Sequence, residues 1–191
     1  NIFLLTIANY NKHKMKQLKT RTEQILATMP ILAWVAFAAY VIETGAVLYS
    51  YTISFVDPEA AKDVYRGLNL YRLSKINFWY YTQAISLVAG LAVSKAVVAW
   101  LVIRALTKFR LENPFTMDMV VRLEKISYAA FGTWVLAMVS NGHLAWMMKE
   151  TGELQGNWIS GEFIFIIALV YVMSQIFRRG VEIQTENELT V

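Results

Sequence analysis

Four long apolar stretches constrain the fold of this chain more than any other feature. They cover residues 30–51, 78–103, 126–148 and 158–177. A helix of about 20 mostly apolar residues is long enough to cross the hydrocarbon core of a bilayer. None of the stretches alternates apolar and polar residues as a membrane barrel strand does, and in lipid only helices and closed barrels satisfy their backbone hydrogen bonds. The sequence therefore predicts an all-α integral membrane protein with four transmembrane helices.

The composition agrees with this fold and excludes several classes of function. Of the 191 residues, 57% are hydrophobic and 17% are charged, whereas a soluble domain has about 45–50% apolar and about 25% charged residues. The chain has no Cys and two His, which excludes disulfide frameworks, thiolate zinc sites and Cys nucleophiles. The sequence also lacks the motifs of dinucleotide-binding, P-loop, zincin and serine-hydrolase proteins. We therefore expect no enzymatic activity, no metal site and no cofactor.

The distribution of Lys and Arg predicts the orientation. Cytoplasmic loops are enriched in these residues, and the predicted topology places twelve of the 18 on the side that holds both ends of the chain. Both termini should therefore face the cytoplasm, with the basic loops against anionic headgroups and no direct contact with nucleic acid. The twelve are Lys12, Lys14, Lys16, Lys19, Arg21, Arg104, Lys108, Arg110, Arg122, Lys125, Arg178 and Arg179; the other side has Lys62, Arg66, Arg72, Lys75 and Lys149.

The chain divides into three parts by sequence. Residues 1–14 are predicted to be an upstream extension, because residues 2–8 are apolar for too short a length to span a membrane and a basic amphipathic segment starts at Met15. Residues 15–180 should form the four-helix membrane domain. Residues 181–191 should form an acidic cytoplasmic tail.

The connection at residues 57–77 is predicted to form an amphipathic helix on the outer surface. Asp57 can cap this helix, Pro58 suits its first turn, and apolar residues recur at helical spacing until Gly67 and Asn69. The helix could be a connector that shields the transmembrane helices, or it could act as a lid or a partner surface.

The cytoplasmic loop between the second and third spans contains the motif Asn113, Pro114, Phe115 and Thr116. Asn before Pro is a typical helix start, so we expect Asn113 to cap a helix whose first turns lie at residues 117–125 and which continues into the third span. A structural elbow and a docking surface are both consistent with this motif.

Three charged residues, Glu43, Lys95 and Glu162, lie within the predicted spans, where a charge is costly and invites a functional interpretation. Glu43 should lie slightly outward of the middle of the first span, and Lys95 slightly inward of the middle of the second. Helical side chains lean toward the N-terminus of their helix, so these two lean toward one another. We expect an intramembrane Glu43–Lys95 pair, which could be structural or part of an ion pathway.

A polar pocket is predicted near the outer ends of the third and fourth spans. Asn141, His143 and Glu162 lie there, with Glu43 close to the same depth. Two carboxylates and an imidazole can bind zinc or relay a proton. The alternative is that His143 and Glu162 contact interfacial water.

The acidic tail combines carboxylates with apolar residues, which a tail that only solvates the chain does not need. We expect it to dock a cytoplasmic partner by pairing its charges with a basic surface and burying its apolar side chains. The residues in question are Glu182, Glu186, Asn187, Glu188, Leu189 and Val191.

The tail sequence RRGVEIQTENELTV resembles the ending of the bacterial membrane proteins grouped as domain of unknown function 2975. The motif at residues 113–116, followed by Leu123 and by Ile126-Ser127-Tyr128, is similar to that family's central signature. The resemblance covers the chain from Met15 onward and implies four spans in a bacterial inner membrane. It also implies a small helix-turn-helix regulator as the cytoplasmic partner, because genes of this family often neighbour one for such a protein.

Three functions remain open from the sequence. The first is a non-enzymatic sensor or anchor for a cytoplasmic regulator. The second is a small transporter or ion-coupled protein that uses Glu43, Lys95 and Glu162. The third is an accessory subunit of a larger membrane complex, and self-association into a homo-oligomer is compatible with all three.

Overall fold

The computed structural model describes residues 21–64, 69–109, 114–151 and 163–188, and their regular secondary structure is helical. The described part contains four long helices, so the all-α prediction is confirmed there. At about 1.5 Å per residue, the shortest of the four is about 39 Å long, more than the hydrocarbon thickness of a bilayer. The long helices are α2 (Arg21–Ile53), α4 (Phe78–Leu106), α5 (Met117–Thr151) and α6 (Phe163–Glu188); the short ones are η1 (Pro58–Lys62) and α3 (Tyr71–Ile76).

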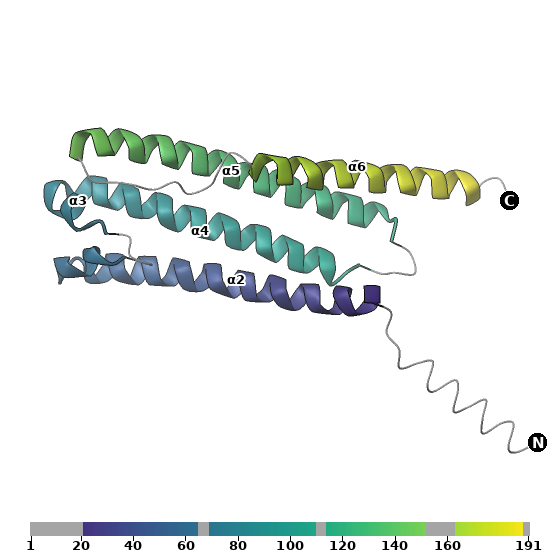
Figure 1. Ribbon diagram of the computed structural model, residues 1–191, viewed down its shortest axis with the longest axis horizontal. Coiled ribbons are helices and arrows are strands. Elements are labelled where there is room, and N and C mark those ends of the chain that lie inside the picture. Colours follow the sequence, from purple (N-terminus) through teal and green to yellow (C-terminus); the bar gives the residue numbers. More distant parts are fainter. Residues whose placement is uncertain (1–20, 65–68, 110–113, 152–162, 189–191) are drawn as a thin grey trace, which may run out of the picture.

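The long helices lie side by side in the order α2, α4, α5, α6 (Figure 1). The extensive contacts join α2 to α4, α4 to α5, and α5 to α6. Successive helices are antiparallel, so the start of α2, the α4–α5 connection and the end of α6 lie at one end of the molecule (Figure 1). The described helices thus form an open row rather than a closed bundle, with α2 and α6 at its edges.

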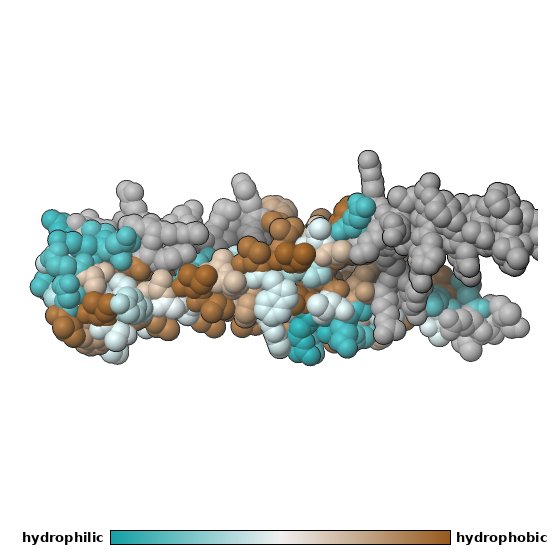
Figure 2. Space-filling view, turned by 90° about the horizontal axis from the view of Figure 1, so that it is seen from below, coloured by the Kyte–Doolittle hydropathy of each residue, from teal (hydrophilic) through white to brown (hydrophobic). Residues whose placement is uncertain are grey.

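Three of the helices are long and apolar enough to cross a membrane. They are Gln24–Ile53, Phe78–Leu106 and Ile164–Asn187, which belong to α2, α4 and α6. The predicted third span lies within α5, which is longer than these but is not among the described helices that are apolar enough to cross a membrane. Figure 2 shows mostly hydrophobic residues along the middle of the row, with hydrophilic residues gathered at the α3 end and again toward the other end. An apolar surface of this extent fits a lipid environment.

Two clusters of buried side chains hold the ends of the row. The cluster at the α3 end joins α2, the α2–α4 connection (residues 57–77), α4 and α5; the other joins α4, α5 and α6. The first contains Val47, Ala61, Val64, Leu70, Leu73, Tyr81, Ala84, Ile85, Val88, Ala89, Leu144 and Met147. The second contains Ala105, Met119 and Ile126, with Leu101, Val102, Phe109, Leu123, Val170 and Phe177 packed around them.

The α2–α4 connection differs from the single amphipathic helix that the sequence predicts. Its described residues form two short helices, η1 and α3, and residues 65–68 lie outside the described part. The predicted start is confirmed: the Asp57 carboxylate accepts a hydrogen bond from the backbone N–H of Glu59 at 2.9 Å, and Pro58 occupies the first helical position. The segment is fixed to α2 by Ser50, whose hydroxyl donates to the carbonyl of Ala60 at 2.9 Å. Local contacts with α2 and α4 therefore shape this connection.

Truncating Leu73 tests whether the α2–α4 connection is part of the core. Leu73 is 4% exposed, so the variant Leu73→Ala should lower stability by about 2–4 kcal/mol through lost burial and a residual cavity. The measurement is the midpoint of thermal unfolding of the purified protein in mild detergent. The matched control is Leu32→Ala, because Leu32 is 61% exposed on α2; equal effects of the two variants would contradict the packing described here.

Candidate functional site

The two predicted intramembrane charges lie on facing helices. Among the ion pairs between described side chains, none joins Glu43 on α2 to Lys95 on α4. The Lys95 ammonium instead lies over the ring of Tyr40, 5.9 Å from its centroid. Tyr40 precedes Glu43 by about one turn of α2, so Lys95 contacts α2 about one turn from the predicted position at Glu43. The Glu43–Lys95 pair stays a prediction.

The residues of the predicted outer pocket contact side chains other than those the sequence predicts. His143 Nε2 is hydrogen-bonded to Gln83 Oε1 on α4 at 3.0 Å, and its ring stacks on that of Trp146 with centroids 5.7 Å apart. The row places α4 between α2 and α5, so Glu43 and His143 are not brought together. Asn141 lies on the same helix as His143, and Glu162 lies outside the described residues.

No group of three His, Asp or Glu side chains that could hold a metal ion is found within the described ranges. The partner that the structure gives to His143, Gln83, was missed by the sequence analysis. A polar side chain early in the second span was the available signal.

The loop motif packs against α6. The ring centroids of Phe115 and Phe177 lie 5.2 Å apart. A Cβ atom added to Gly180 would lie 2.6 Å from Phe115 Cδ1. Any side chain larger than that of glycine at position 180 would therefore collide with the Phe115 ring. Phe115 and Gly180 belong to the two sequence segments that carry the family resemblance, and the structure brings them into contact.

The predicted first turns of this helix, at residues 117–125, are confirmed: α5 begins at Met117. Asn113, the expected cap, lies outside the described residues. The cap is Thr116, whose hydroxyl accepts a hydrogen bond from the backbone N–H of Met119 at 3.3 Å. A threonine hydroxyl serves the orphan N–H groups of a first turn as an asparagine side chain does. The expected continuation of this helix into residues 126–148 is confirmed.

An ion pair between α5 and α6 was also missed by the sequence analysis. Arg178 Nη2 donates to Glu124 Oε1 at 2.6 Å, and Gln175 Nε2 donates to the same oxygen at 3.2 Å. The Glu124 side chain is 17% exposed and that of Arg178 is 41% exposed. The only sequence signal was a carboxylate among basic residues just before the third span. Nothing in the sequence showed that Arg178, 54 residues later, lies opposite it.

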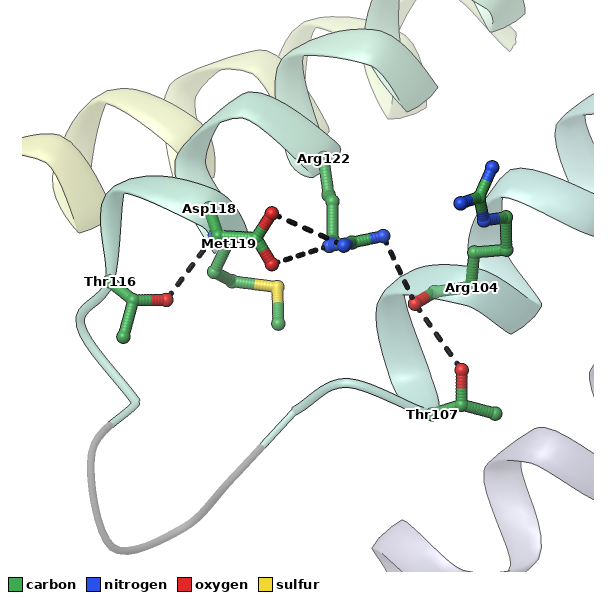
Figure 3. A network of polar contacts seen from close by, with 6 residues as sticks. All are labelled: Arg104, Thr107, Thr116, Asp118, Met119 and Arg122. Carbon is green, nitrogen blue, oxygen red and sulfur yellow. Dashed lines mark hydrogen bonds and ion pairs between the residues drawn. The ribbon is translucent and has the colours of Figure 1, made fainter.

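A second polar network joins the start of α5 to the end of α4 (Figure 3). The Arg122 guanidinium donates to both carboxylate oxygens of Asp118, at 2.8 and 3.2 Å, and Nη1 donates to the backbone carbonyl of Arg104 at 3.5 Å. The Thr107 hydroxyl donates to the same carbonyl at 3.3 Å. A cation at this position satisfies a terminal carbonyl of α4 and complements the negative end of its dipole.

Arg122 also affects the titration of Asp118. Its hydrogen bond lowers the pKa of the Asp118 carboxyl below the usual value of 3.8. Because the pKa is lowered in the folded state, the pair stabilises the protein above the unfolded pKa and this contribution is lost as pH falls through the folded value. The network therefore stays charged throughout the neutral range.

The predicted acidic tail is helical up to Glu188, because α6 extends that far. Glu182 accepts a hydrogen bond from Arg179 Nη1 at 2.7 Å, and the side chains of Arg179 and Glu182 are 64% and 50% exposed. Glu186 and Asn187 are exposed on the same helix. The side chain of Glu188, and residues 189–191 with Leu189 and Val191, lie outside the described part.

Adding a methyl group at Gly180 tests the contact between the loop and α6. In Gly180→Ala the new Cβ collides with the Phe115 ring, so stability should fall by about 1–3 kcal/mol as the ring is displaced. The double variant with Phe115→Ala should recover part of this loss, because the collision is removed. Thermal unfolding in detergent measures both.

The matched control for this experiment is Gly132→Ala, where an added Cβ meets nothing within 4 Å. This variant should be neutral or slightly stabilising, because Ala favours a helix over Gly by about 0.5–1 kcal/mol. A gain in stability for Gly180→Ala similar to that of the control would show that Phe115 does not pack there.

Removing Glu124 tests the ion pair between α5 and α6. Glu124→Ala leaves the partly buried Arg178 without its carboxylate and should cost about 1–2 kcal/mol. Glu182→Ala removes an exposed ion pair on α6 alone and should cost less than about 0.5 kcal/mol. A double-mutant cycle with Arg178→Ala isolates the coupling, and additive losses would mean that Glu124 and Arg178 do not interact.

Comparison with known proteins identifies the family. The family model described as "Protein of unknown function (DUF2975)" matches residues 69–191. The match includes the loop motif and α6 but begins after α2, so it is narrower than the expected resemblance from Met15 onward. No curated protein and no solved structure matches the chain. Because the match covers more than half of the residues, the chain belongs to the DUF2975 family of proteins of unknown function.

Proposed function

We propose that this chain is a non-enzymatic, four-span membrane protein that holds a cytoplasmic regulator on the exposed end of α6. The observation that supports this most directly is the length of α6. The helix continues to Glu188, which is about 16 Å beyond residue 177, the predicted end of the fourth span. Figure 1 shows this end of α6 extending past the beginning of α5.

The surface of this extension has the chemistry of a docking helix. Glu182 and Glu186 lie one turn apart and are exposed, and Ile183 beside them is 46% exposed. Acidic side chains next to an accessible apolar one suit a partner that offers a basic surface with an apolar pocket. A small helix-turn-helix protein, whose nucleic-acid surface is basic, has this chemistry.

The base of the extension is fixed to the rest of the row, which favours a role in signalling. Phe115 packs on Gly180, and Glu124 pairs with Arg178, so the first turn of the extension is bound to the loop and to α5. A change in the relative positions of α5 and α6 would therefore move the docking surface. This arrangement supports a sensor that holds or releases its partner in response to a change in the membrane.

The proposal includes α5 as the third span. Residues 126–148 contain no Asp, Glu, Lys or Arg, and the hydroxyl side chains of Ser127, Thr133 and Ser140 are buried inside the row. Ser127 is 3% exposed and its hydroxyl donates to the carbonyl of Ile167 on α6 at 3.3 Å, while Ser140 is fully buried. A helix whose polar groups are satisfied by its neighbours can cross a bilayer with a lower mean hydropathy.

The orientation and location are part of the same proposal. Arg104, Lys108, Arg122 and Lys125 lie around the α4–α5 connection, at the end of the row where α2 starts and α6 ends (Figure 1). This concentration of cations supports a cytoplasmic location for that end, in a bacterial inner membrane.

A pull-down from mild-detergent extract tests the docking surface. The intact chain should retain a small helix-turn-helix protein that a chain stopped after Arg179 does not. The double variant Glu182→Gln with Glu186→Gln should weaken binding about tenfold, the ratio expected for losing two exposed charge pairs of about 0.7 kcal/mol each.

The matched control neutralises Glu59 and Asp63, two exposed acidic residues at the opposite end of the row. This control should leave the partner bound. Identical sets of bound proteins for the intact and the shortened chain would exclude the end of α6 as the docking surface. Co-migration of both chains with a large membrane complex would favour an accessory subunit instead.

A transporter is the second candidate, and the position of Lys95 favours it. A cation reaches across from α4 to Tyr40 in the middle of the two most apolar helices, one turn from Glu43. Intramembrane charges of this kind often mark an ion pathway. If the chain transports an ion, Glu43→Gln in sealed vesicles should abolish the flux without loss of folded protein; loss of folded protein alone would indicate a structural charge pair.

A further inference from the structure

An apolar groove of about 520 Å³ runs between α2 and α4. Its volume falls in the range of pockets that bind small ligands, about 300–1,000 Å³. The groove opens to the outside of the row, since Val41, Leu48, Val93 and Val97 on its walls are each close to half exposed. It is lined by Phe37, Val41, Thr44, Gly45, Leu48, Val93, Ala96, Val97 and Trp100.

The walls of the groove suit a hydrocarbon chain. Thr44 contributes the one hydroxyl among the lining residues, and that hydroxyl already donates to the carbonyl of Tyr40 at 2.8 Å. Gly45 leaves open space in the wall, because a Cβ atom there would meet nothing within 4 Å. A transmembrane helix with its side chains is about 10–12 Å wide, whereas an acyl chain is a single file of methylene groups that fits a narrow groove.

A cation lies at one end of the groove. Val93, Val97 and Trp100 follow one face of α4 at helical spacing, and Arg104 comes next on that face. The Arg104 guanidinium lies over the Trp100 ring, 4.8 Å from its centroid. Arg104 takes part in the polar network at this end through its backbone carbonyl, and its guanidinium is not one of the groups bonded there (Figure 3). Lys108 is exposed one turn further on.

The position of this cation along the helix matches that of a lipid headgroup. The 29 residues of α4 extend over about 43 Å, which equals the thickness of a bilayer with its headgroup regions, about 40–45 Å. The last turn of α4 therefore lies at headgroup depth when the helix spans the bilayer. Basic residues at this depth, beside an apolar crevice between helices, are typical of sites for anionic lipids.

We propose that the α2–α4 groove binds an anionic phospholipid, with an acyl chain against Gly45 and Val97 and the phosphate paired with Arg104 and Lys108. The site is continuous from the apolar walls through the Trp100 ring to the guanidinium. The site is formed by α2 and α4 alone, so lipid can bind there whether or not a partner docks on α6.

Native mass spectrometry of the full chain in neutral detergent tests this site. The probes are phosphatidylglycerol and phosphatidylcholine with the same acyl chains, titrated separately. We expect one molecule of phosphatidylglycerol to be retained more tightly than phosphatidylcholine. Arg104→Gln should weaken binding of phosphatidylglycerol about fivefold, the effect of one basic residue at the headgroup, and should leave binding of phosphatidylcholine unchanged.

Gly45→Leu is the second variant; its Cβ meets nothing within 4 Å, and the rest of the side chain should occupy the groove. It should weaken binding of both lipids by about tenfold or more, because the acyl chain loses its buried surface. Lys125→Gln is the matched control, since Lys125 is an exposed cation on α5 away from the groove; it should leave both affinities unchanged.

Three outcomes would overturn the proposal. Equal loss of phosphatidylglycerol in Arg104→Gln and Lys125→Gln would mean that only the general positive charge matters. Retention of the lipid in Gly45→Leu would exclude the groove. Displacement of the lipid by soluble glycerol phosphate at a similar concentration would mean that the site recognises a free phosphate and not a lipid.

Discussion

The packing of α4 between α2 and α5 is the constraint on which the rest of the structure depends. Within a membrane, helices associate mainly by close van der Waals packing, which small residues allow. The buried positions of α4 include Ala84, Ala89, Ala92 and Ala96, so its neighbours approach closely on both sides. Because α2 and α6 each pack extensively on one long neighbour, the position of α4 determines where α2 lies and, through α5, where α6 lies.

The two ends of the row are built differently. The α3 end is held by a large apolar cluster and by aromatic contacts, such as that of Tyr51 with Phe78 at 6.2 Å and with Tyr81 at 5.7 Å. The opposite end has a smaller apolar cluster and, in addition, polar contacts between helices, among them Arg178 with Glu124 and Arg122 with the backbone carbonyl of Arg104. Polar contacts contribute less and are easier to rearrange than a closely packed core. A change in the relative positions of the helices should therefore cost least at the end of the row that contains the α4–α5 connection.

The long helices were predictable from the sequence because hydropathy depends on local composition. The predicted ranges 30–51, 78–103 and 126–148 each fall within one long helix. The cap by Asp57 was equally local. By contrast, the open row could not be predicted, since hydropathy does not determine which helices are neighbours. The contacts of Phe115 with Gly180 and of Glu124 with Arg178 depend on that arrangement, and each joins residues more than 50 positions apart.

The two proposed sites are joined by a continuous set of contacts. The backbone carbonyl of Arg104 is bonded to Arg122 in the second turn of α5; the first turn is capped by Thr116, and the adjacent Phe115 packs on Gly180. A shift of α4 caused by lipid at Arg104 would therefore act on the base of the α6 extension. Coupling between two binding sites is reciprocal, so a regulator bound on α6 would change the affinity for the lipid by the same factor. Taken together, the two proposals predict a sensor that responds to the composition of the bilayer around α2 and α4 and needs no ligand from outside the membrane.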